Sequence, residues 1–548
     1  MARFPTPTSP GDVRAPMPLW QLYPIFFAAV FLSHMTLLRL PYYWDEGGYY
    51  IPAALDFYRT GALVPRFTNA HPPLPSILLA GWWHLSGFVP SGTRTLICMV
   101  SAAALLAVFA LARRLIGTRA AVATALLTGV YPIWFAQSTL AHADIFAAVF
   151  TLWGLAFYLE SHADPHPRTE VAGTRIQRLQ ITVALLFTLA ALSKETAIVQ
   201  PAALAVLELV LLARAWRTPP QRRVHAGWLT ALLFPLLPLA AWFAYHHHVT
   251  GFTFGNPTYL QYNATANFTV AHIVHALQSR AMHLFWQRNI WVPLTLALAC
   301  LLQPARPPEQ AQQLPRPILR AIGLLVAANW LFFSVLGGAP LTRYLLPVYP
   351  LLLLVSVATW RSRTRMWPLL AALTTAAFLS ALWINPPYSF APEDNLTYRD
   401  MIVVHQEAVS YLSAHYPDAR VLTAWPVTAD LVRPELGYTG HAFRIVPLDD
   451  FTPSLIARAA QHPADFDTAI VFTTHFIPPE LRRYLLSHGG SPRGAEFASN
   501  HVLTPEQIAA ELGGNIVWRD DRNGEWAAIL RFPRARTAAP VAIPRSPL

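Results

Sequence analysis

Charge is scarce in this chain. Only 13% of its 548 residues are Asp, Glu, Lys or Arg, and 54% are hydrophobic, whereas about 25% of the residues of an ordinary soluble domain are charged. The composition therefore excludes a purely soluble protein.

Lysine is almost absent. Lys194 is the only lysine among the 40 basic residues, and the other 39 are arginine. The net charge of +11 raises the question of nucleic-acid binding, but residues 1–385 carry 26 basic and 11 acidic side chains (+15) and residues 386–548 carry 14 and 18 (−4). The basic excess belongs to the apolar part of the chain, so we expect no nucleic-acid partner.

Cysteine is also rare. Cys98 and Cys300 both lie inside apolar runs, and they give no sign of a disulfide framework or a cysteine metal cluster. We expect two small, buried hydrophobic side chains.

Long apolar runs dominate the first 385 residues. A membrane-spanning helix needs about 20 residues, and eleven stretches approach that length. They lie near residues 20–38, 95–112, 120–138, 144–159, 177–193, 196–212, 228–245, 285–302, 318–336, 344–360 and 366–384. The pattern predicts a mainly α membrane protein, a polytopic bundle of about eleven transmembrane helices.

The distribution of arginine predicts the orientation of this bundle. With the N-terminus (residues 1–19) in the cytoplasm, 18 of the 26 basic residues of the first 385 fall on cytoplasmic segments, as the positive-inside rule requires. Residues 20–385 then form the membrane domain, with outer loops at 40–94 and 246–284.

An odd number of spans places residues 386–548 outside the membrane. Short β-rich runs alternate there with helix-like stretches, and Asn523-Gly524 lies between two of them as a hairpin turn. We expect an extracytoplasmic α/β domain behind a proline-rich linker, NPPYSFAPEDN, that begins at Asn385.

The first outer loop begins with an acidic pair, Asp45-Glu46, among aromatic residues. A carboxylate at the membrane surface can act as a general base. The alternative is that Asp45 caps a helix starting at Glu46, with Gly47 and Gly48 allowing a close backbone approach.

Three other polar residues lie on the predicted outer side, one in the first outer loop and two at the start of the fourth span. His71, in the segment HPPL, could bind a phosphate, a metal ion or an acceptor, or could simply mark a helix-entry turn. Asp144, with His142 two residues before it, opens the fourth span. An ionisable residue at membrane depth points to function, and helix capping is the alternative.

Two outer turns carry the remaining candidates. Lys194-Glu195 lies between spans five and six, and the lone lysine suggests a site that needs a compact point charge rather than a planar guanidinium. Arg343 stands at the outer start of span ten, where it could pair with a phosphate or reach the lipid headgroups. Two or three acids with one lysine, one arginine and several histidines suit transfer of a group from a phosphate leaving group.

These segments, in this order, resemble those of the GT-C type glycosyltransferases that use polyprenyl-phosphate sugars. The resemblance covers residues 20–385 and rests on five motifs: the acidic pair after span one, HPPL, the Asp that opens a later span, the turn SKE, and RYLLP. Its relatives include protein O-mannosyltransferases and the bacterial aminoarabinose transferase that modifies lipid A.

The resemblance implies roles for these residues. Asp45 would be the catalytic base, supported by Glu46, and Lys194 and Arg343 would hold the lipid phosphate. Asp144 would shape the acceptor or sugar site.

The other substrate-binding candidates are His71, His142 and Glu195. His71 matches the HPP of the mannosyltransferases, whereas the aminoarabinose transferase has Glu-Lys before the prolines, so a divalent metal ion at this site stays open and no cofactor is assigned. Transfer would be inverting, from a polyprenyl-phosphate sugar to a lipid, glycan or protein acceptor on the outer face of the bacterial inner membrane. A transporter or flippase of a lipid-linked substrate is the rival class, although no inverted repeat is visible.

Overall fold

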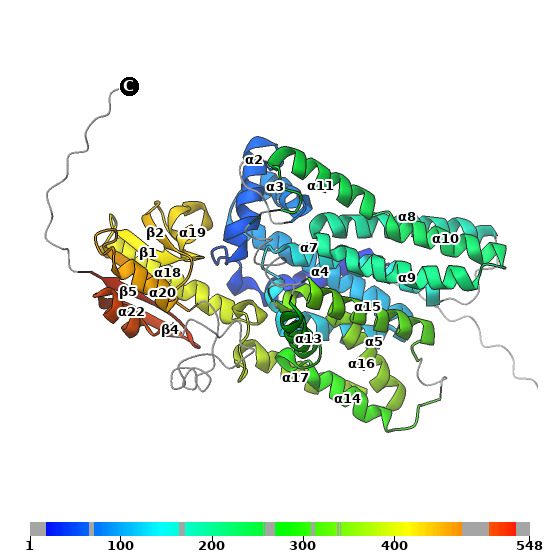
Figure 1. The fold of residues 1–548 in the computed structure, drawn as a ribbon. Helices are drawn as coiled ribbons and strands as arrows, with labels where there is room; N and C mark the ends of the chain where they lie inside the picture. The colour runs from blue at the N-terminus through cyan, green and yellow to red at the C-terminus, as the bar shows by residue number, and fades with distance from the viewer. Residues whose placement is uncertain are drawn as a thin grey trace, which may run out of the picture.

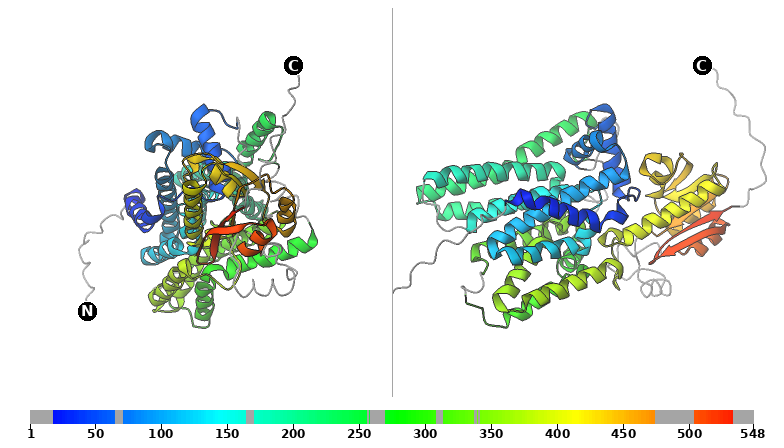
Figure 2. Two further views of the ribbon diagram at one scale, coloured as in Figure 1. Left: turned by 90° about the vertical axis from the view of Figure 1, so that its left-hand side faces the viewer. Right: turned by 180° about the vertical axis from the view of Figure 1, so that it is seen from behind.

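The computed structural model describes residues 18–64, 71–163, 170–255, 257, 269–307, 313–336, 339, 341–473 and 503–532. Most of the predicted cytoplasmic N-terminus, residues 1–19, lies outside these ranges. Figure 1 shows a long helical bundle with a small β-sheet region at one end, and the view from behind in Figure 2 shows the same arrangement.

The helical bundle comprises residues 19–383. Its elements are η1 (Leu19–Leu22), α1 (Tyr23–Ser33), η2 (Met35–Leu37), η3 (Glu46–Tyr50), α2 (Ile51–Thr60), α3 (Leu74–Ser86), α4 (Pro90–Ile116), α5 (Thr118–Val130), α6 (Pro132–Gln137), α7 (Ala143–Ala163), α8 (Glu170–Ser193), η4 (Glu195–Ile198), α9 (Val199–Arg214), α10 (Pro219–Leu233), α11 (Leu236–Thr250), α13 (Val270–Phe285), η6 (Gln287–Asn289), α14 (Trp291–Leu301), α15 (Arg316–Val335), η7 (Thr342–Leu345), α16 (Tyr349–Arg363) and α17 (Trp367–Trp383).

Six helices of the described residues are long and apolar enough to cross a membrane, and four more are apolar but shorter. The longest uninterrupted one, α4, begins with Pro90 at its first position and ends before Gly117, which has a positive φ of 79°. Such a proline start and glycine stop are typical of helix ends. Six candidate spans indicate a multi-pass membrane protein, and the predicted number of eleven stays a prediction.

Proline breaks two of the predicted spans into shorter helices. The predicted span 120–138 is divided between α5 and α6 at Pro132, and the span 228–245 falls on α10 and α11, which are separated at Phe234-Pro235. Proline lacks the N–H that would continue the helical hydrogen bonds, so a helix ends or bends where it occurs.

The C-terminal sheet has five strands in the order β2-β1-β3-β5-β4. They are β1 (Arg420–Ala424), β2 (Arg444–Leu448), β3 (Thr468–Phe472), β4 (Asn515–Arg522) and β5 (Glu525–Arg531). The first three strands are parallel, and β5 pairs antiparallel with β3 and β4. The predicted hairpin is confirmed, since β4 and β5 are joined by Asn523 and Gly524, both with positive φ, as a tight hairpin turn of this kind requires.

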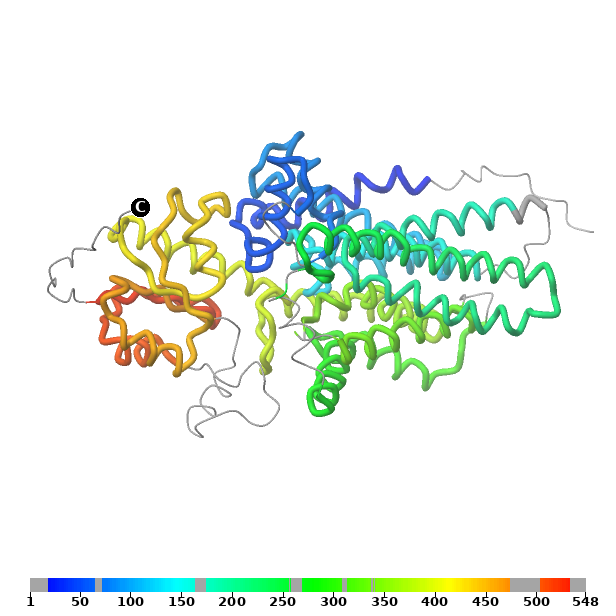
Figure 3. The backbone as a smooth tube through the Cα atoms, turned by 45° about the horizontal axis from the view of Figure 1, so that its top comes forward, coloured from blue at the N-terminus to red at the C-terminus, as the bar shows by residue number. Residues whose placement is uncertain are grey.

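Six helical elements of the described residues accompany the sheet. They are η8 (Pro392–Asp394), α18 (Thr397–His415), α19 (Val427–Val432), η9 (Pro434–Leu436), α20 (Pro453–Ala460) and α22 (Pro505–Leu512). Helix α18 packs against β4 and β5, and α19 packs against β1 and β2. Figure 3 shows α18 leading from the bundle into the sheet region.

The sheet region contacts the loop that carries the acidic pair. The Tyr42 amide donates to the Leu436 carbonyl at 3.2 Å, and a Cβ at Gly48 would lie 2.2 Å from the Trp425 ring. The close backbone approach predicted from the glycines therefore exists, and its partner is an indole from the C-terminal part of the chain. This contact fixes the backbone beside Asp45.

Candidate active site

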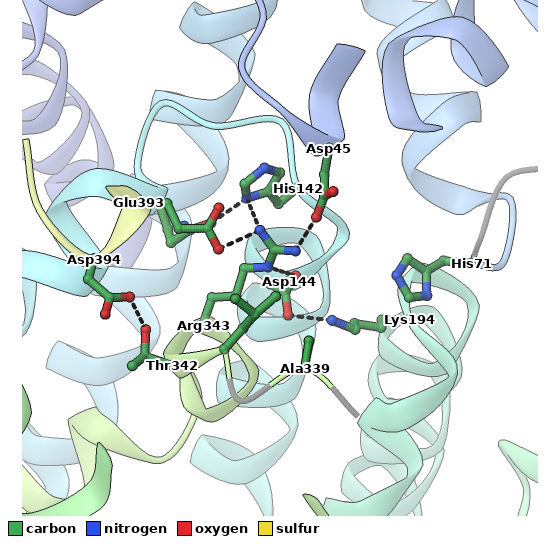
Figure 4. A network of polar contacts seen from close by, with 12 residues as sticks. Asp45, His71, His142, Asp144, Lys194, Ala339, Thr342, Arg343, Glu393 and Asp394 are labelled. Carbon is green, nitrogen blue, oxygen red and sulfur yellow. Dashed lines mark hydrogen bonds and ion pairs between the residues drawn. The ribbon is translucent and has the colours of Figure 1, made fainter. Parts of the chain in front are cut away.

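Arg343 is the centre of a buried ion cluster (Figure 4). It lies in η7, the short helix between α15 and α16, with 4% of its side chain exposed. Its Nη2 contacts Asp45 Oδ2, its Nη1 donates to Glu393 Oε1 at 2.6 Å, and its Nε lies 3.4 Å from Asp144 Oδ2. One guanidinium thus joins three carboxylates that are far apart in the sequence.

Lys194 extends this cluster. It precedes η4 in an extended conformation, and its Nζ donates to Asp144 Oδ1 at 2.6 Å. The same Nζ lies 4.0 Å from the centre of the Tyr344 ring, which is within the range of a cation–π contact. Asp144 therefore bridges the two cations, lysine on one oxygen and arginine on the other.

Asp45 occupies the N-cap position of η3, but its side chain makes no capping hydrogen bond. Its carboxylate points to Arg343 instead, and 17% of that side chain is exposed, against 3% for Asp144. The helix-capping alternative for this side chain is therefore wrong. Asp45 is the more accessible of these two carboxylates.

Glu46 is held in place by hydrogen bonds and by an ion pair. Its carboxylate accepts from the amides of Tyr43 and Ala141, both at 2.7 Å, and pairs with Arg94 at 3.2 Å. Both charged side chains are fully buried, and burial raises the pKa of Glu46 although Arg94 opposes the shift. Glu46 thus fastens the Asp45 loop to the segment before α7, and its partner Arg94 was not singled out from the sequence.

His71 and Glu195 form a second pair. His71 Nδ1 lies 2.9 Å from Glu195 Oε2, and the imidazole stacks on Tyr50 at 5.8 Å between ring centres. His71 is 3% exposed. In Figure 4 it lies beside Lys194, on the opposite side of the cluster from Glu393. These two predicted residues therefore border the cluster from the side of η4.

His142 lies next to the guanidinium. Its Nδ1 is 2.8 Å from Gln137 Oε1 and 3.4 Å from Arg343 Nη1, and its Nε2 has no hydrogen-bond partner among the described residues. The structure thus brings the eight predicted site residues to one end of the bundle, with Asp45, Asp144, Lys194 and Arg343 in direct ionic contact.

Glu393 was missed because it lies in the segment that the sequence presents as a linker. The helix η8 carries Glu393 to Arg343 and Asp394 to Thr342, with Gln287 Nε2 donating to Asp394 at 2.9 Å. Burial raises the pKa of Glu393 to about 8, and the nearby Asp45 adds to the rise against the opposing effect of Arg343. At neutral pH this carboxyl is therefore largely protonated.

A small cavity of about 20 Å³ lies beside the two cations. Its lining residues come from α7, η4, α9, α15 and η7: Asp144, Ala147, Lys194, Thr196, Ala197, Gln200, Phe333, Arg343, Tyr344 and Pro347. The lining combines the charged side chains of Asp144, Lys194 and Arg343 with apolar ones such as Ala147 and Phe333. Such a lining suits the junction between an anionic group and hydrocarbon.

The chemistry of the cluster follows from its charges. At neutral pH the two cations are balanced by Asp45 and Asp144, since Glu393 holds its proton. A buried cation can bind an anionic leaving group in place of the carboxylate that balances its charge. Asp45 can then take a proton. Within the described ranges, no three His, Cys, Asp or Glu side chains are grouped so that they could hold a metal ion.

Comparisons with known proteins agree with this geometry. Residues 70–242 match the family model described as dolichyl-phosphate-mannose-protein mannosyltransferase, while no curated protein sequence matches the chain.

Among solved structures, ArnT from Cupriavidus metallidurans bound to undecaprenyl phosphate matches with 16% identity and a TM-score of 0.54, over 93% of this chain and 98% of that chain. The apo state of the same protein matches with 15% identity and a TM-score of 0.51 over the same shares. The Pmt1-Pmt2 protein O-mannosyltransferase complex of S. cerevisiae, bound to its sugar donor, matches with 16% identity and a TM-score of 0.36, over 47% of this chain and 37% of that one.

The chain thus resembles GT-C type glycosyltransferases. It is similar in sequence to the protein O-mannosyltransferases over residues 70–242 and in fold to ArnT over nearly its whole length.

Proposed function

We propose that this protein is an integral membrane glycosyltransferase that moves a sugar from a polyprenyl-phosphate carrier to an acceptor on the outer face of the bacterial cytoplasmic membrane. The observation that carries the proposal is the buried contact of Asp45 and Asp144 with Lys194 and Arg343 at the wall of a partly apolar cavity. The similarity in fold to ArnT in complex with undecaprenyl phosphate supports the choice of carrier.

The phosphate of the donor is held by the two cations. Arg343 offers a planar fork of donors and Lys194 a point charge, and both already face the cavity. The isoprenoid chain has no hydrogen-bonding groups, so the apolar lining by Phe333 and Ala147 suits its first carbons. Asp144 stays between the cations and sets their separation.

Transfer proceeds in one displacement. The acceptor hydroxyl gives its proton to the Asp45 carboxylate while its oxygen forms a bond to the anomeric carbon. The bond between that carbon and the phosphate oxygen breaks, and the electron pair leaves with the polyprenyl phosphate, whose charge Lys194 and Arg343 stabilise. Attack opposite the leaving group inverts the anomeric configuration.

Donor binding also prepares the base. In the ligand-free protein Asp45 contacts the Arg343 guanidinium. A phosphate that takes Arg343 for itself releases the Asp45 carboxylate, which can then turn to the acceptor hydroxyl.

The orientation follows the arginine distribution, with a cytoplasmic N-terminus and the sheet region outside. The site lies at the end of the bundle next to that sheet, which accords with an acceptor approaching from outside. The lipid, glycan or protein nature of the acceptor is set by the surface around Asp45.

The test uses the purified full-length chain in lipid nanodiscs. It is incubated with polyprenyl phosphates carrying radiolabelled sugars and with extracts of lipid, glycan and protein acceptors. Transfer of label from the lipid to an acceptor supports the proposal. Movement of the intact labelled lipid across a liposome membrane, without transfer to any acceptor, overturns it in favour of a flippase.

A further inference from the structure

A glutamine in the cavity wall has a hydrogen-bonding role that the mechanism above does not use. Gln200 lies in the first turn of α9 and lines the cavity with Lys194 and Asp144. It is 3% exposed, and its Nε2 donates to Asn329 Oδ1 of α15 at 2.9 Å. The two amides therefore join α9 to α15 below the ion cluster.

The orientation of the Gln200 amide is determined by its neighbour. Asn329 Nδ2 donates to the Leu325 carbonyl one turn earlier in α15, at 2.8 Å. Because a carbonyl only accepts, Asn329 must turn its NH₂ group toward Leu325 and its oxygen toward Gln200. Gln200 must then present its own NH₂ group to Asn329, so its Oε1 faces elsewhere as an acceptor.

That acceptor has no partner. Gln200 Oε1 is buried and makes no hydrogen bond among the described residues. Buried acceptors are normally satisfied, because leaving one without a donor costs stability. A cavity-lining glutamine with such an oxygen points to a ligand that brings a donor.

The chemistry of the donor substrate limits what that group can be. A polyprenyl phosphodiester is an acceptor along its phosphate and has no N–H or O–H along its hydrocarbon chain. Only its sugar carries hydroxyl or amino hydrogens. We propose that Gln200 Oε1 accepts a hydrogen bond from a hydroxyl or amino group of the transferred sugar, so that Gln200, positioned by Asn329, is a specificity residue of the donor site.

The cavity lining agrees with this placement. Lys194 and Arg343, which would take the phosphate, line the cavity together with Gln200, Thr196 and Ala197. The inference rests on the proposed function, since it assigns the sugar of that reaction.

The experiment combines a protein variant with donor analogues. Wild type and Gln200→Met, which keeps the side-chain length and removes the acceptor, are assayed with the parent donor and with each monodeoxy or deamino analogue of its sugar. We expect Gln200→Met to lower kcat/KM for the parent donor by about 10- to 100-fold, the loss expected when one buried hydrogen-bonding group is left without its partner. For wild type, one analogue should show a similar loss of kcat/KM relative to the parent donor. Gln200→Met should not lower kcat/KM for that analogue any further.

Two controls make the result decisive. Gln180→Met makes the same change on α8, where Gln180 donates to the Val224 carbonyl. In this variant each analogue should lose as much kcat/KM relative to the parent donor as it does in wild type. Asn329→Ala leaves Gln200 in place but frees its amide to rotate, so it should lower the penalty for the same analogue without abolishing it. This variant also tests the inference if Gln200→Met does not fold.

The outcomes separate the two levels of the proposal. If wild type transfers sugar and every analogue carries the same penalty in Gln200→Met as in wild type, the sugar contact is overturned and the proposed function stands. If wild type transfers no sugar from any polyprenyl-phosphate donor, the proposed function fails and the contact fails with it.

Discussion

Two buried acidic clusters lie at opposite ends of α7, and they differ in how fully their polar atoms are paired. At the end next to the sheet region, Asp144 contacts Lys194 and Arg343. Toward the other end Glu208 of α9 accepts from Tyr158 at 2.5 Å and lies 2.8 Å from both His162 and His225. Both carboxylates are buried.

Hydrogen bonding is complete for the carboxylate of the Glu208 cluster and incomplete for the polar atoms around Arg343. Both oxygens of Glu208 have hydrogen-bond partners. In the ion cluster around Arg343, His142 Nε2 and Gln200 Oε1 have no hydrogen-bond partner in the described part of the chain, and Asp144 Oδ2 and Arg343 Nε meet only as an ion pair at 3.4 Å. A satisfied cluster joins helices, whereas unsatisfied atoms at a cavity mark the place where a ligand completes the bonding.

The largest effect is expected from Asp45→Asn, which removes the proposed base but keeps the shape of the side chain. Transfer should fall by about 10³-fold or more, since general-base catalysis contributes roughly 10²–10⁴-fold. The measurement is the initial rate of label transfer in nanodiscs. The exposed Asp418→Asn is the matched control and should retain the wild-type rate. A rate of Asp45→Asn close to that control would remove Asp45 from the role of base.

The next effect concerns the single lysine. Lys194→Arg keeps the charge but replaces a compact ammonium that fits between Asp144 and the Tyr344 ring by a longer planar group. We expect a loss of about 10²-fold in kcat/KM, the scale of a misplaced electrostatic contact in a reacting site. The exposed Arg522→Lys, which makes the reverse change far from the cavity, should have no effect. Full activity of Lys194→Arg would mean that the site needs only a positive charge.

A smaller effect is expected from the titration of Glu393. Its pKa of about 8 means that rising pH ionises this carboxyl next to Arg343, and the new negative charge competes with the donor phosphate. The KM for the donor should therefore rise severalfold between about pH 7 and pH 9 in wild type and stay level in Glu393→Gln. If the KM of wild type and that of Glu393→Gln changed with pH in the same way, Glu393 would not be the titrating group.

The raised pKa of Glu393 also makes the stability of the fold depend on pH. The folded protein holds the Glu393 proton up to about pH 8, whereas the unfolded chain releases it near the ordinary value of 4.5. A raised carboxyl pKa therefore makes the folded state lose stability as the pH rises from about 4.5 to about 8. Glu393→Gln should lessen that decline in a thermal-unfolding series.

The smallest effect on transfer is expected at the other cluster. Glu208→Gln weakens the bonds to the two histidines, and it should lower the free energy of unfolding by about 1–3 kcal/mol, the usual cost of disturbing buried hydrogen bonds. The transfer rate of the folded protein should stay within about twofold of wild type. Thermal unfolding and the transfer assay on the same sample measure both quantities. A large loss of transfer without loss of stability would give Glu208 a role in the reaction.

Much of the site could be predicted from short motifs at the ends of apolar runs. Asp45, Asp144, Lys194 and Arg343 each lie close to the end of a predicted span, and a buried charge requires a partner. Since all four were expected on the outer face, their meeting could be anticipated, although their pairing could not. Which oxygen contacts which cation depends on the crossing of α7, η4 and η7.

The missed residues depend on tertiary contacts. Glu393 lies in a proline-rich segment whose composition predicts a linker, and only the docking of the sheet region brings it to Arg343. Arg94 stands at the first turn of α4 and looks like one more basic residue, yet it is fully buried against Glu46. An arginine at the outer edge of an apolar run was a usable signal for a buried ion pair.

We infer that the ion cluster around Arg343 binds the phosphate of a polyprenyl carrier, whereas the Glu208 cluster does not. The affinity for polyprenyl phosphate is measured by titration into wild type, Lys194→Gln and Glu208→Gln in nanodiscs of neutral lipid. Lys194→Gln should raise Kd by about tenfold or more, while Glu208→Gln should bind as tightly as wild type. Equal affinities in all three proteins would show that the Arg343 cluster does not hold the phosphate.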